Sequence, residues 1–341
     1  MSMFDRKRTY DGTLPKTPVL SLDASKRSTR KLRSEFLMFM EHTPHEMLLQ
    51  LIELLDRTDV ISLASTSKPI RRRLLPYIFD RVKCSWDDLL IEWKSSCGVC
   101  APISNPELIE TLRLTSSCSK NEWAFPFHVL FDRDSLMLNL KSITLPSSGS
   151  TNFFKYCDVA PGLLKLQINA DRSDSAFCLE HVRNFPYLKE LILSSFHIEE
   201  HDDGASDICP KLKTLRLENC TWNYPFNLEN LGKNNISSLH LEYSSSFIIS
   251  ERFKHFLSCP SFTNLKELSI VNNENNLRLT ISVQIMTLIQ AMPTLKILKL
   301  KGNIYNEALI RASESTASNH TNVVAVRDVK VLYSSFLRDI R

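Results

Sequence analysis

The sequence predicts an α/β fold in which a short helical domain is followed by a long array of parallel strands. Three observations predict this class. A six-residue apolar pattern recurs along residues 79–333, amphipathic segments separate its copies, and residues 43–79 carry apolar side chains at helical spacing. The 341 residues include 43% hydrophobic and 23% charged side chains, which is ample material for a core.

The repeated pattern has the form apolar-x-x-apolar-x-apolar. Its middle residues lie 23 to 31 positions apart, and its copies cover residues 79–84, 109–114, 140–145, 163–168, 188–193, 212–217, 236–241, 265–270, 295–300 and 326–331. The last two apolar residues of each copy face the same side of a short strand, and the first anchors the turn that enters it. No copy can bury its apolar side alone, so we expect the copies to stack into a parallel sheet and form a solenoid.

The segments between the copies should return the chain along the outside of this solenoid. The clearest are amphipathic and contain a proline near their ends, where it stops a helix; they are residues 177–186, 250–262 and 282–293. Cys220, Asn273 and Asn303 stand three residues after the last apolar residue of a copy. At that position a side chain can satisfy backbone groups of the descending turn.

This arrangement resembles the leucine-rich-repeat family, in its longer cysteine-containing or irregular form, over residues 79–333. The alternative is a stack of unrelated strand–helix units in an ordinary α/β domain. That alternative needs glycines in its loops, and the whole chain has only seven. The pattern therefore favours the repeat family.

The helical spacing of residues 43–79 predicts three short helices. A capping box formed by Thr43 and Glu46, with a proline at the first helical position, should begin the first of them. Leu49 and Leu54 widen the apolar surface of this helix beyond one face. We therefore expect part of that surface to meet a partner or the first repeat.

Residues 43–75 resemble an F-box, on the positions of Pro44, Glu46, Leu48, Leu51, Leu55, Asp59, Leu63 and Lys68. The segment departs from the F-box pattern at Thr43, at Thr66–Ser67 and at Ile70, where a leading Leu, Val-Cys and Trp are usual. F-box proteins with leucine-rich repeats are substrate receptors of SCF-type cullin ubiquitin ligases. The resemblance implies a non-catalytic subunit whose F-box binds the Skp-family adaptor, and through it a cullin, while the repeats hold an unknown protein substrate.

The same resemblance implies that seven residues supply or support the adaptor-facing surface: Pro44, Leu48, Leu51, Ile52, Leu55, Val60 and Leu63. For Leu51 and Leu55 the alternative is a position inside the three-helix unit. Two other functions stay open. The chain could be a scaffold that uses its adaptor for assembly, or a repeat-only interaction module whose N-terminal helices cap the solenoid.

The residue between the two inward apolar residues of each copy should point to the concave face of the sheet, where we expect the substrate to bind. Four of them, Arg113, Arg216, His240 and Lys299, would form a basic stripe that could select an acidic or phosphorylated segment. The alternative interpretation is an ordinary solvated sheet face.

The resulting division of the chain is a disordered basic tail (1–39), the F-box (40–78), the leucine-rich-repeat solenoid (79–333) and a C-terminal cap or tail (334–341). Within residues 1–35, nine Lys and Arg residues face four acidic ones, which is typical of a solvated leader, a nuclear import signal or a nucleic-acid contact. No aromatic residues are interleaved with the basic cluster at 26–33 to stack on bases, which argues against a nucleic-acid partner.

The cysteines and the apolar runs bear on the compartment. The nine cysteines are scattered and odd in number, and the N-terminus lacks the apolar stretch of a secretion signal. No uncharged apolar run approaches the roughly 18 residues needed to cross a bilayer. We expect a reduced protein that is cytoplasmic, nuclear or both and has no membrane partner.

No catalytic or cofactor chemistry is predicted. The glycines form no G-x-G pattern, and Gly232 with its following lysine lacks the rest of a phosphate loop. His197 and His201 match the H-x-x-E-H metal pattern, but their segment directly follows a strand and should be a turn. Cys97 and Cys100 have no two further ligands nearby. We therefore expect no enzyme, no metal and no cofactor.

Overall fold

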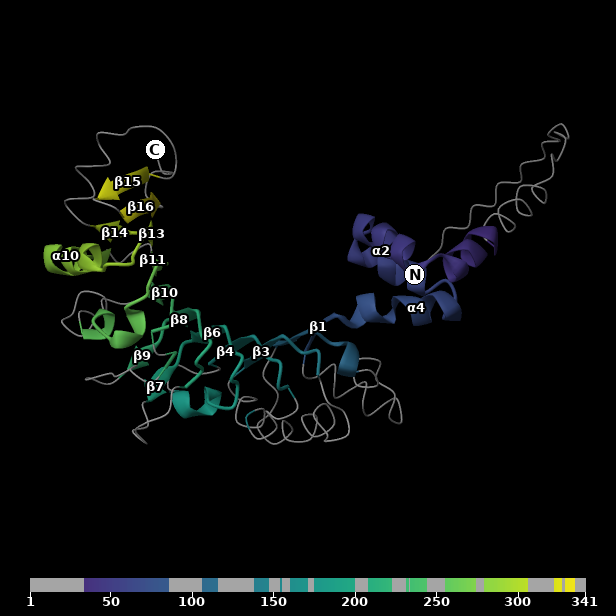
Figure 1. Ribbon diagram of the computed structural model, residues 1–341, viewed down its shortest axis with the longest axis horizontal. Helices are drawn as coiled ribbons and strands as arrows, with labels where there is room; N and C mark the ends of the chain where they lie inside the picture. The colour runs from purple at the N-terminus through teal and green to yellow at the C-terminus, as the bar shows by residue number, and fades with distance from the viewer. Residues whose placement is uncertain are drawn as a thin grey trace, which may run out of the picture. The chain divides into compact units, whose positions relative to one another are not determined.

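The computed structural model is a mixed α/β structure with a large, mainly parallel sheet and several helices, the class that the sequence predicts (Figure 1). It divides into two compact units between Ile78 and Phe79. The residues that the structure describes are 34–85, 106–115, 138–146, 154, 160–170, 175–199, 208–222, 231–232, 234–243, 255–273, 279–305, 322–326 and 329–334. Residues 1–33 of the predicted tail, the Cys97–Cys100 pair, His201 and the segment 335–341 lie outside them.

The N-terminal unit contains the three predicted helices, α2 (His45–Leu54), α3 (Arg57–Ala64) and α4 (Lys68–Phe79). Asp56 caps α3, since its Oδ1 accepts a hydrogen bond of 2.8 Å from the N–H of Asp59. The helices enclose a small core to which each contributes, made of Met40, Leu48, Val60, Ala64, Ile70 and Leu74.

The unit also contains a helix that the sequence interpretation missed. Residues 34–42 are helical, so the prediction of a disordered tail as far as residue 39 is wrong for 34–39. Leu37 and Met40 lie three positions apart on this helix, and both pack against the core of the N-terminal unit. Burial of these two side chains explains why the segment is ordered.

The predicted capping box is also wrong. Thr43 is only 6% exposed, and its N–H and hydroxyl both donate to the carbonyl of Phe39, at 2.8 and 2.6 Å. Thr43 therefore completes the end of helix 34–42 rather than beginning the next helix. Helix α2 starts at His45 after Pro44 and has no side-chain cap.

All ten predicted strands of the C-terminal unit are present, and they lie in chain order in one sheet (Figure 1). They are β1 (Arg81–Ser85), β2 (Thr111–Thr115), β3 (Ser142–Pro146), β4 (Lys165–Asn169), β6 (Glu190–Ser194), β8 (Thr214–Glu218), β10 (Ser238–Tyr243), β11 (Glu267–Asn272), β13 (Ile297–Gly302) and β16 (Val329–Ser334). All ten pair in parallel. Strand β15 (Asn322–Val326) adds an antiparallel edge that was not predicted.

The register places equivalent positions of the pattern opposite each other. Val82 lies opposite Leu112, and the match of middle apolar residues continues strand by strand to Leu268 and Leu298. The last strand departs from the prediction by two residues, because Val331 rather than Val329 lies opposite Leu298.

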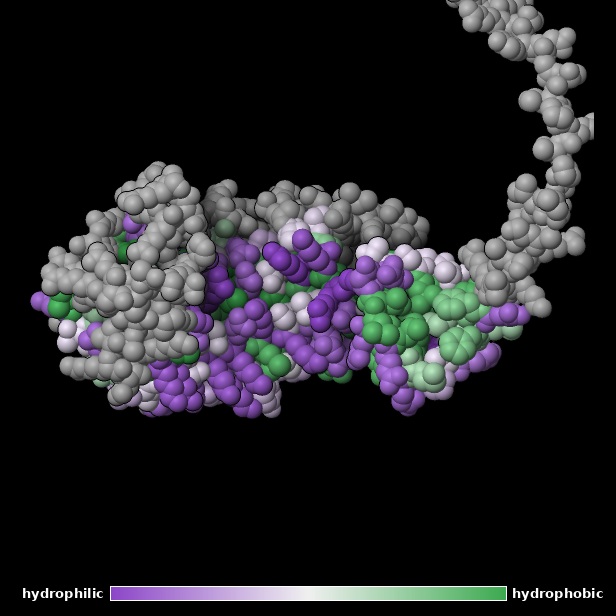
Figure 2. Space-filling view, turned by 90° about the horizontal axis from the view of Figure 1, so that it is seen from above, coloured by the Kyte–Doolittle hydropathy of each residue, from purple (hydrophilic) through white to green (hydrophobic). Residues whose placement is uncertain are grey.

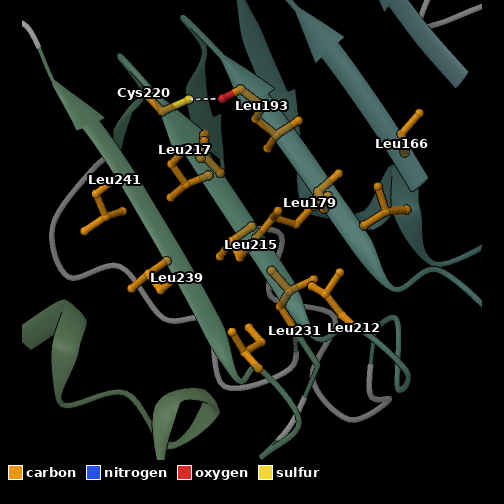
Figure 3. Packing of buried hydrophobic residues seen from close by; sticks show 14 of the residues in the cluster. Leu166, Leu179, Leu193, Leu212, Leu215, Leu217, Cys220, Leu231, Leu239 and Leu241 are labelled. Atoms are coloured by element: carbon orange, nitrogen blue, oxygen red, sulfur yellow. Dashed lines mark hydrogen bonds between the residues drawn. The ribbon is translucent and has the colours of Figure 1, made fainter. Parts of the chain in front are cut away.

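The inward residues of β2 to β13 form one continuous core beneath the sheet, and Figure 3 shows part of this core around β4 to β10. The first apolar residue of each of these copies is also buried, as the pattern predicts; these residues are Ile109, Leu140, Leu163, Leu188, Leu212, Ile236, Leu265 and Leu295. Because successive strands bury equivalent leucines, the core extends across the sheet as a layer.

Short elements return the chain between the strands. They are the helix α10 (Val283–Ala291), the one-turn helices η1 (Pro106–Leu108), η3 (Leu179–Val182) and η5 (Pro260–Phe262), and the helical residues 255–257. Helix α10 begins with a cap, since the Oγ of Ser282 accepts from the N–H of Ile285, and it ends two residues before Pro293.

Two small parallel sheets complete the return segments. One consists of β5 (Ala176–Cys178), β7 (His197–Glu199) and β9 (Thr221–Trp222), and the other of β12 (Leu279–Thr280) and β14 (Ile304–Tyr305). Residues 197–199 are therefore a strand rather than the expected turn, because β7 pairs on both sides, with β5 and with β9.

Candidate interaction surfaces

The N-terminal unit carries an exposed apolar surface. Figure 2 shows hydrophobic residues gathered on one face of this unit. The large exposed apolar residues of the unit are Phe36, Met38, Phe39, Met47, Leu54 and Ile61, which we call the apolar surface. They lie on helix 34–42, α2 and α3. A set of exposed apolar side chains of this size on one small unit is typical of a protein-binding site.

Helix α2 contributes to both the core and the apolar surface. Leu48 is 1% exposed and packs in the core, whereas Leu54 is 86% exposed and Met47 is 52% exposed. A helix of ten residues with apolar side chains on nearly all sides cannot bury them all in the core of so small a unit. The side chains left over are the ones available to a partner.

The seven adaptor-facing residues predicted from the sequence have different positions. Leu48 and Val60 are buried in the core, and Pro44 is exposed. The other four are half-buried and pack against that core from outside; they are Leu51, Ile52, Leu55 and Leu63. Most of the predicted residues therefore support the surface, and the exposed Met47, Leu54 and Ile61 were not predicted to belong to it.

The second candidate is the outward face of the parallel sheet. The strand register places the residues between the inward leucines in one row across the sheet: Lys83, Arg113, Thr144, Gln167, Ile192, Arg216, His240, Ser269 and Lys299. Arg216 and His240 are direct neighbours in this row. Lys299 lies two strands beyond His240, and Arg113 lies four strands before Arg216. At the far end Leu332 lies opposite Lys299, because the register of β16 differs from the predicted one by two residues.

Acidic residues surround the middle of this row. We use the term charged cluster for Ser194, Arg216, Glu218, His240 and Glu242. The guanidinium of Arg216 contacts the Glu218 carboxylate and lies 3.5 Å from Oε2 of Glu242. Nε2 of His240 is 3.6 Å from the same Glu242 oxygen, and the hydroxyl of Ser194 donates to Glu218 at 2.6 Å.

The charged cluster is not a basic stripe. Burial, followed by the nearby Arg216 charge, lowers the pKa of His240, although Glu242 and Glu218 act in the opposite direction. With His240 neutral, one guanidinium faces two carboxylates. Lys299 is also paired, since its Nζ lies 2.5 Å from Oε1 of Glu267. Three of the four residues predicted to attract an acidic segment are thus next to carboxylates.

Inside the turns, polar side chains join successive strands. The thiol of Cys220 donates to the carbonyl of Leu193 at 3.2 Å, as expected for this position (Figure 3). The amide of Asn273 instead reaches the carboxylate of Glu242. Its neighbour Asn272 donates to the carbonyl of Asn303 at 2.9 Å and takes the predicted role in that turn.

Within the residues that the structure describes, no three His, Cys, Asp or Glu side chains gather where they could hold a metal ion. In the same part of the chain, no helix combines the length and apolar character needed to span a membrane. His197 hydrogen-bonds with Thr221 across the small sheet, with 3.0 Å between Nδ1 and Oγ1. Neither a scan against protein-family models nor a search of curated proteins found a match to this chain.

Proposed function

We propose that the N-terminal unit is an F-box, that the C-terminal unit is a leucine-rich-repeat solenoid, and that the chain is a substrate-recognition subunit of an SCF-type ubiquitin ligase. The F-box would bind a Skp-family adaptor and, through it, a cullin. The repeats would hold the protein to be ubiquitinated. The subunit carries out no bond chemistry, because it acts by raising the effective concentration of a substrate lysine near the charged conjugating enzyme.

The observation that carries this proposal is the apolar surface on a helical unit with its own core. An F-box must be a helical unit that folds by itself and still presents apolar side chains to an adaptor. Leu48, Leu51 and Leu55 pack within this unit's core or against it, while Leu54 and Met47 stay exposed. That division fits an adaptor-binding unit, which needs a core of its own and apolar side chains left for a partner.

Strand register supports the solenoid part of the proposal. Nine consecutive strands, β1 to β13, align the same position of the repeated pattern, and the inward leucines of β2 to β13 share one core. A sheet built in this way presents a continuous outward face to a protein ligand.

The test is a pull-down of the full chain with its Skp adaptor and cullin. We expect the wild type to retain both proteins and Met47→Glu/Leu54→Glu to lose both. Burial of two exposed apolar side chains contributes about 2–4 kcal/mol to binding, so two carboxylates at these positions should reduce adaptor affinity at least about 30-fold.

The matched control is Leu138→Glu/Val283→Glu, which makes the same kind of change at two exposed apolar residues of the C-terminal unit. This variant should retain adaptor and cullin. Failure of the folded wild type to retain the adaptor contradicts the F-box proposal. Capture of the adaptor without a cullin contradicts the ligase role and leaves a scaffold that uses the adaptor for assembly.

A further inference from the structure

Lysines lie at the N-terminal ends of five strands of the large sheet. Each occupies the position just before a strand begins, and each is exposed; we call Lys141, Lys189, Lys213, Lys266 and Lys296 the lysine rim. Backbone hydrogen bonds keep these positions in line. The N–H of Lys213 donates to the carbonyl of Lys189 at 2.9 Å, and the N–H of Lys296 donates to that of Lys266 at 2.9 Å.

Most of the lysine rim has no acidic partner. Lys141 pairs with Glu110 at 3.0 Å, but no ion pair forms at Lys189, Lys213, Lys266 or Lys296 within the described residues. The two carboxylates nearest in sequence are already taken. Glu190 pairs with Lys165 at 2.8 Å, and Glu267 pairs with Lys299. Within the described residues, four ammonium groups without a carboxylate partner therefore remain, at the starts of β6, β8, β11 and β13, and Ser237 holds the equivalent position before β10.

The turns that carry the lysine rim are tied to one another. The side-chain amide of Asn235 donates to the carbonyl of Pro210 at 2.7 Å, and that of Asn264 donates to Asn234. The hydroxyl of Thr294 donates to the carbonyl of Leu265 at 2.8 Å. Because each turn is bonded to the preceding one, a ligand orders only the lysine side chains and not the backbone.

The lysine rim and the charged cluster differ in what they can bind. An anion on the charged cluster would have to compete with Glu218 and Glu242 for Arg216. At four of the five lysines of the rim, an anion meets a cation that has no carboxylate partner among the described residues. Nucleic acid is less favoured, because the ammonium of Lys211 lies 4.1 Å from the ring centroid of Tyr187, so a base would have to compete with that cation for one face of the ring.

We propose that the lysine rim binds an acidic segment of the target protein, a run of Asp or Glu in an extended chain that lies across the strand ends. From Lys189 to Lys296 the rim spans four strand spacings, about 19 Å, which is the length of about six extended residues. This inference rests on the proposed function, in which the C-terminal unit holds a target protein. It places the acid-binding site beside the sheet rather than on the predicted stripe.

The probe is a fluorescently labelled hexaglutamate, and its binding to the full chain is measured by fluorescence anisotropy at two salt concentrations. We expect binding that weakens as salt rises, and a Kd about fivefold higher for Lys189→Gln/Lys213→Gln, since each exposed ion pair contributes about 0.5 kcal/mol. The matched control Lys68→Gln/Arg72→Gln removes the same charge from two exposed cationic residues of α4 in the N-terminal unit and should leave the Kd unchanged.

Three results would overturn the proposal. They are the absence of hexaglutamate binding, an equal loss in both double variants, and tighter binding of a single-stranded oligonucleotide of equal charge, which would make the rim a nucleic-acid surface. Adaptor capture by Lys189→Gln/Lys213→Gln is measured in parallel and should equal that of the wild type. If the wild type does not capture the adaptor, the ligase proposal is contradicted. If the wild type captures the adaptor but does not bind the peptide, only the proposal for the lysine rim is contradicted.

Discussion

Cys220 illustrates how one residue joins two strands of the sheet. Its side chain is buried two residues after the end of β8, and its thiol reaches back to the carbonyl of Leu193 on β6. A second carbonyl, that of Glu218, lies 3.5 Å from the sulfur. Burial raises the pKa of the Cys220 thiol to about 11, because a thiolate at this position would lose its hydration. The neutral thiol is therefore part of the folded structure.

Cys220→Ser tests this role, because serine keeps a hydroxyl donor that does not titrate in this range. A thiol whose pKa is raised on folding contributes stability below its unfolded pKa, near 9, and loses it as the pH rises toward 11. We therefore expect the wild type to lose stability relative to Cys220→Ser between pH 9 and 11. Urea unfolding of both proteins at several pH values measures the difference. A stability difference that is constant with pH would contradict the assignment.

At the scale of elements, three adjacent arginines of α4 have different roles. Arg73 donates through Nη1 to the carbonyls of Met40 and Glu41, at 2.7 and 2.9 Å, and through Nη2 to that of Thr43. It thereby satisfies carbonyls at the C-terminal end of helix 34–42. Arg71 donates to Ala64 at 3.3 Å, and Arg72 is exposed. Arg73 is thus the residue of the three that joins helix 34–42 to α4.

Arg73→Met should loosen helix 34–42, while Arg72→Met should not. Hydrogen bonds from a charged group contribute about 1.5–3 kcal/mol, so we expect the free energy of local opening to fall by about 2 kcal/mol in Arg73→Met. The exposed Arg72→Met control should change it by less than about 0.5 kcal/mol. Hydrogen exchange of the amides of residues 34–42, followed by mass spectrometry, measures both. Equal exchange in the two variants would show that the guanidinium of Arg73 does not hold this helix.

Elements with a short-range signal were predictable from the sequence. In β8, the apolar Leu215 and Leu217 alternate with polar residues, which predicts that these two leucines are buried. The spacing of the repeats predicts which strands lie beside β8. Properties that depend on distant partners were not predictable. Glu218 is adjacent to Leu217 in sequence, but its contact with Ser194 exists only because β6 and β8 pair in register. Likewise, nothing in α2 itself distinguishes buried Leu48 from exposed Leu54.

At the scale of the whole sheet, each strand contacts mainly its two neighbours. Strand β8 pairs with β6 on one side and β10 on the other, and the same holds from β2 to β13. No strand in this part of the sheet bridges distant ones. Stability in such an array is approximately a sum of terms for each unit and for each interface between neighbours. A defect in one strand should therefore weaken its neighbours most.

Leu215→Ala tests this expectation at the centre of the sheet. Leu215 is 1% exposed, and truncation of a buried leucine costs about 2–5 kcal/mol. We expect hydrogen-exchange protection to fall most in β6, β8 and β10 and to change least in β2 and β13. The control Thr214→Ala alters the adjacent side chain on the outward face and should change protection by less than about 0.5 kcal/mol. An equal loss from β2 to β13 would mean that the sheet opens as one cooperative unit, because interfaces between neighbouring strands would then be too strong for any strand to open alone.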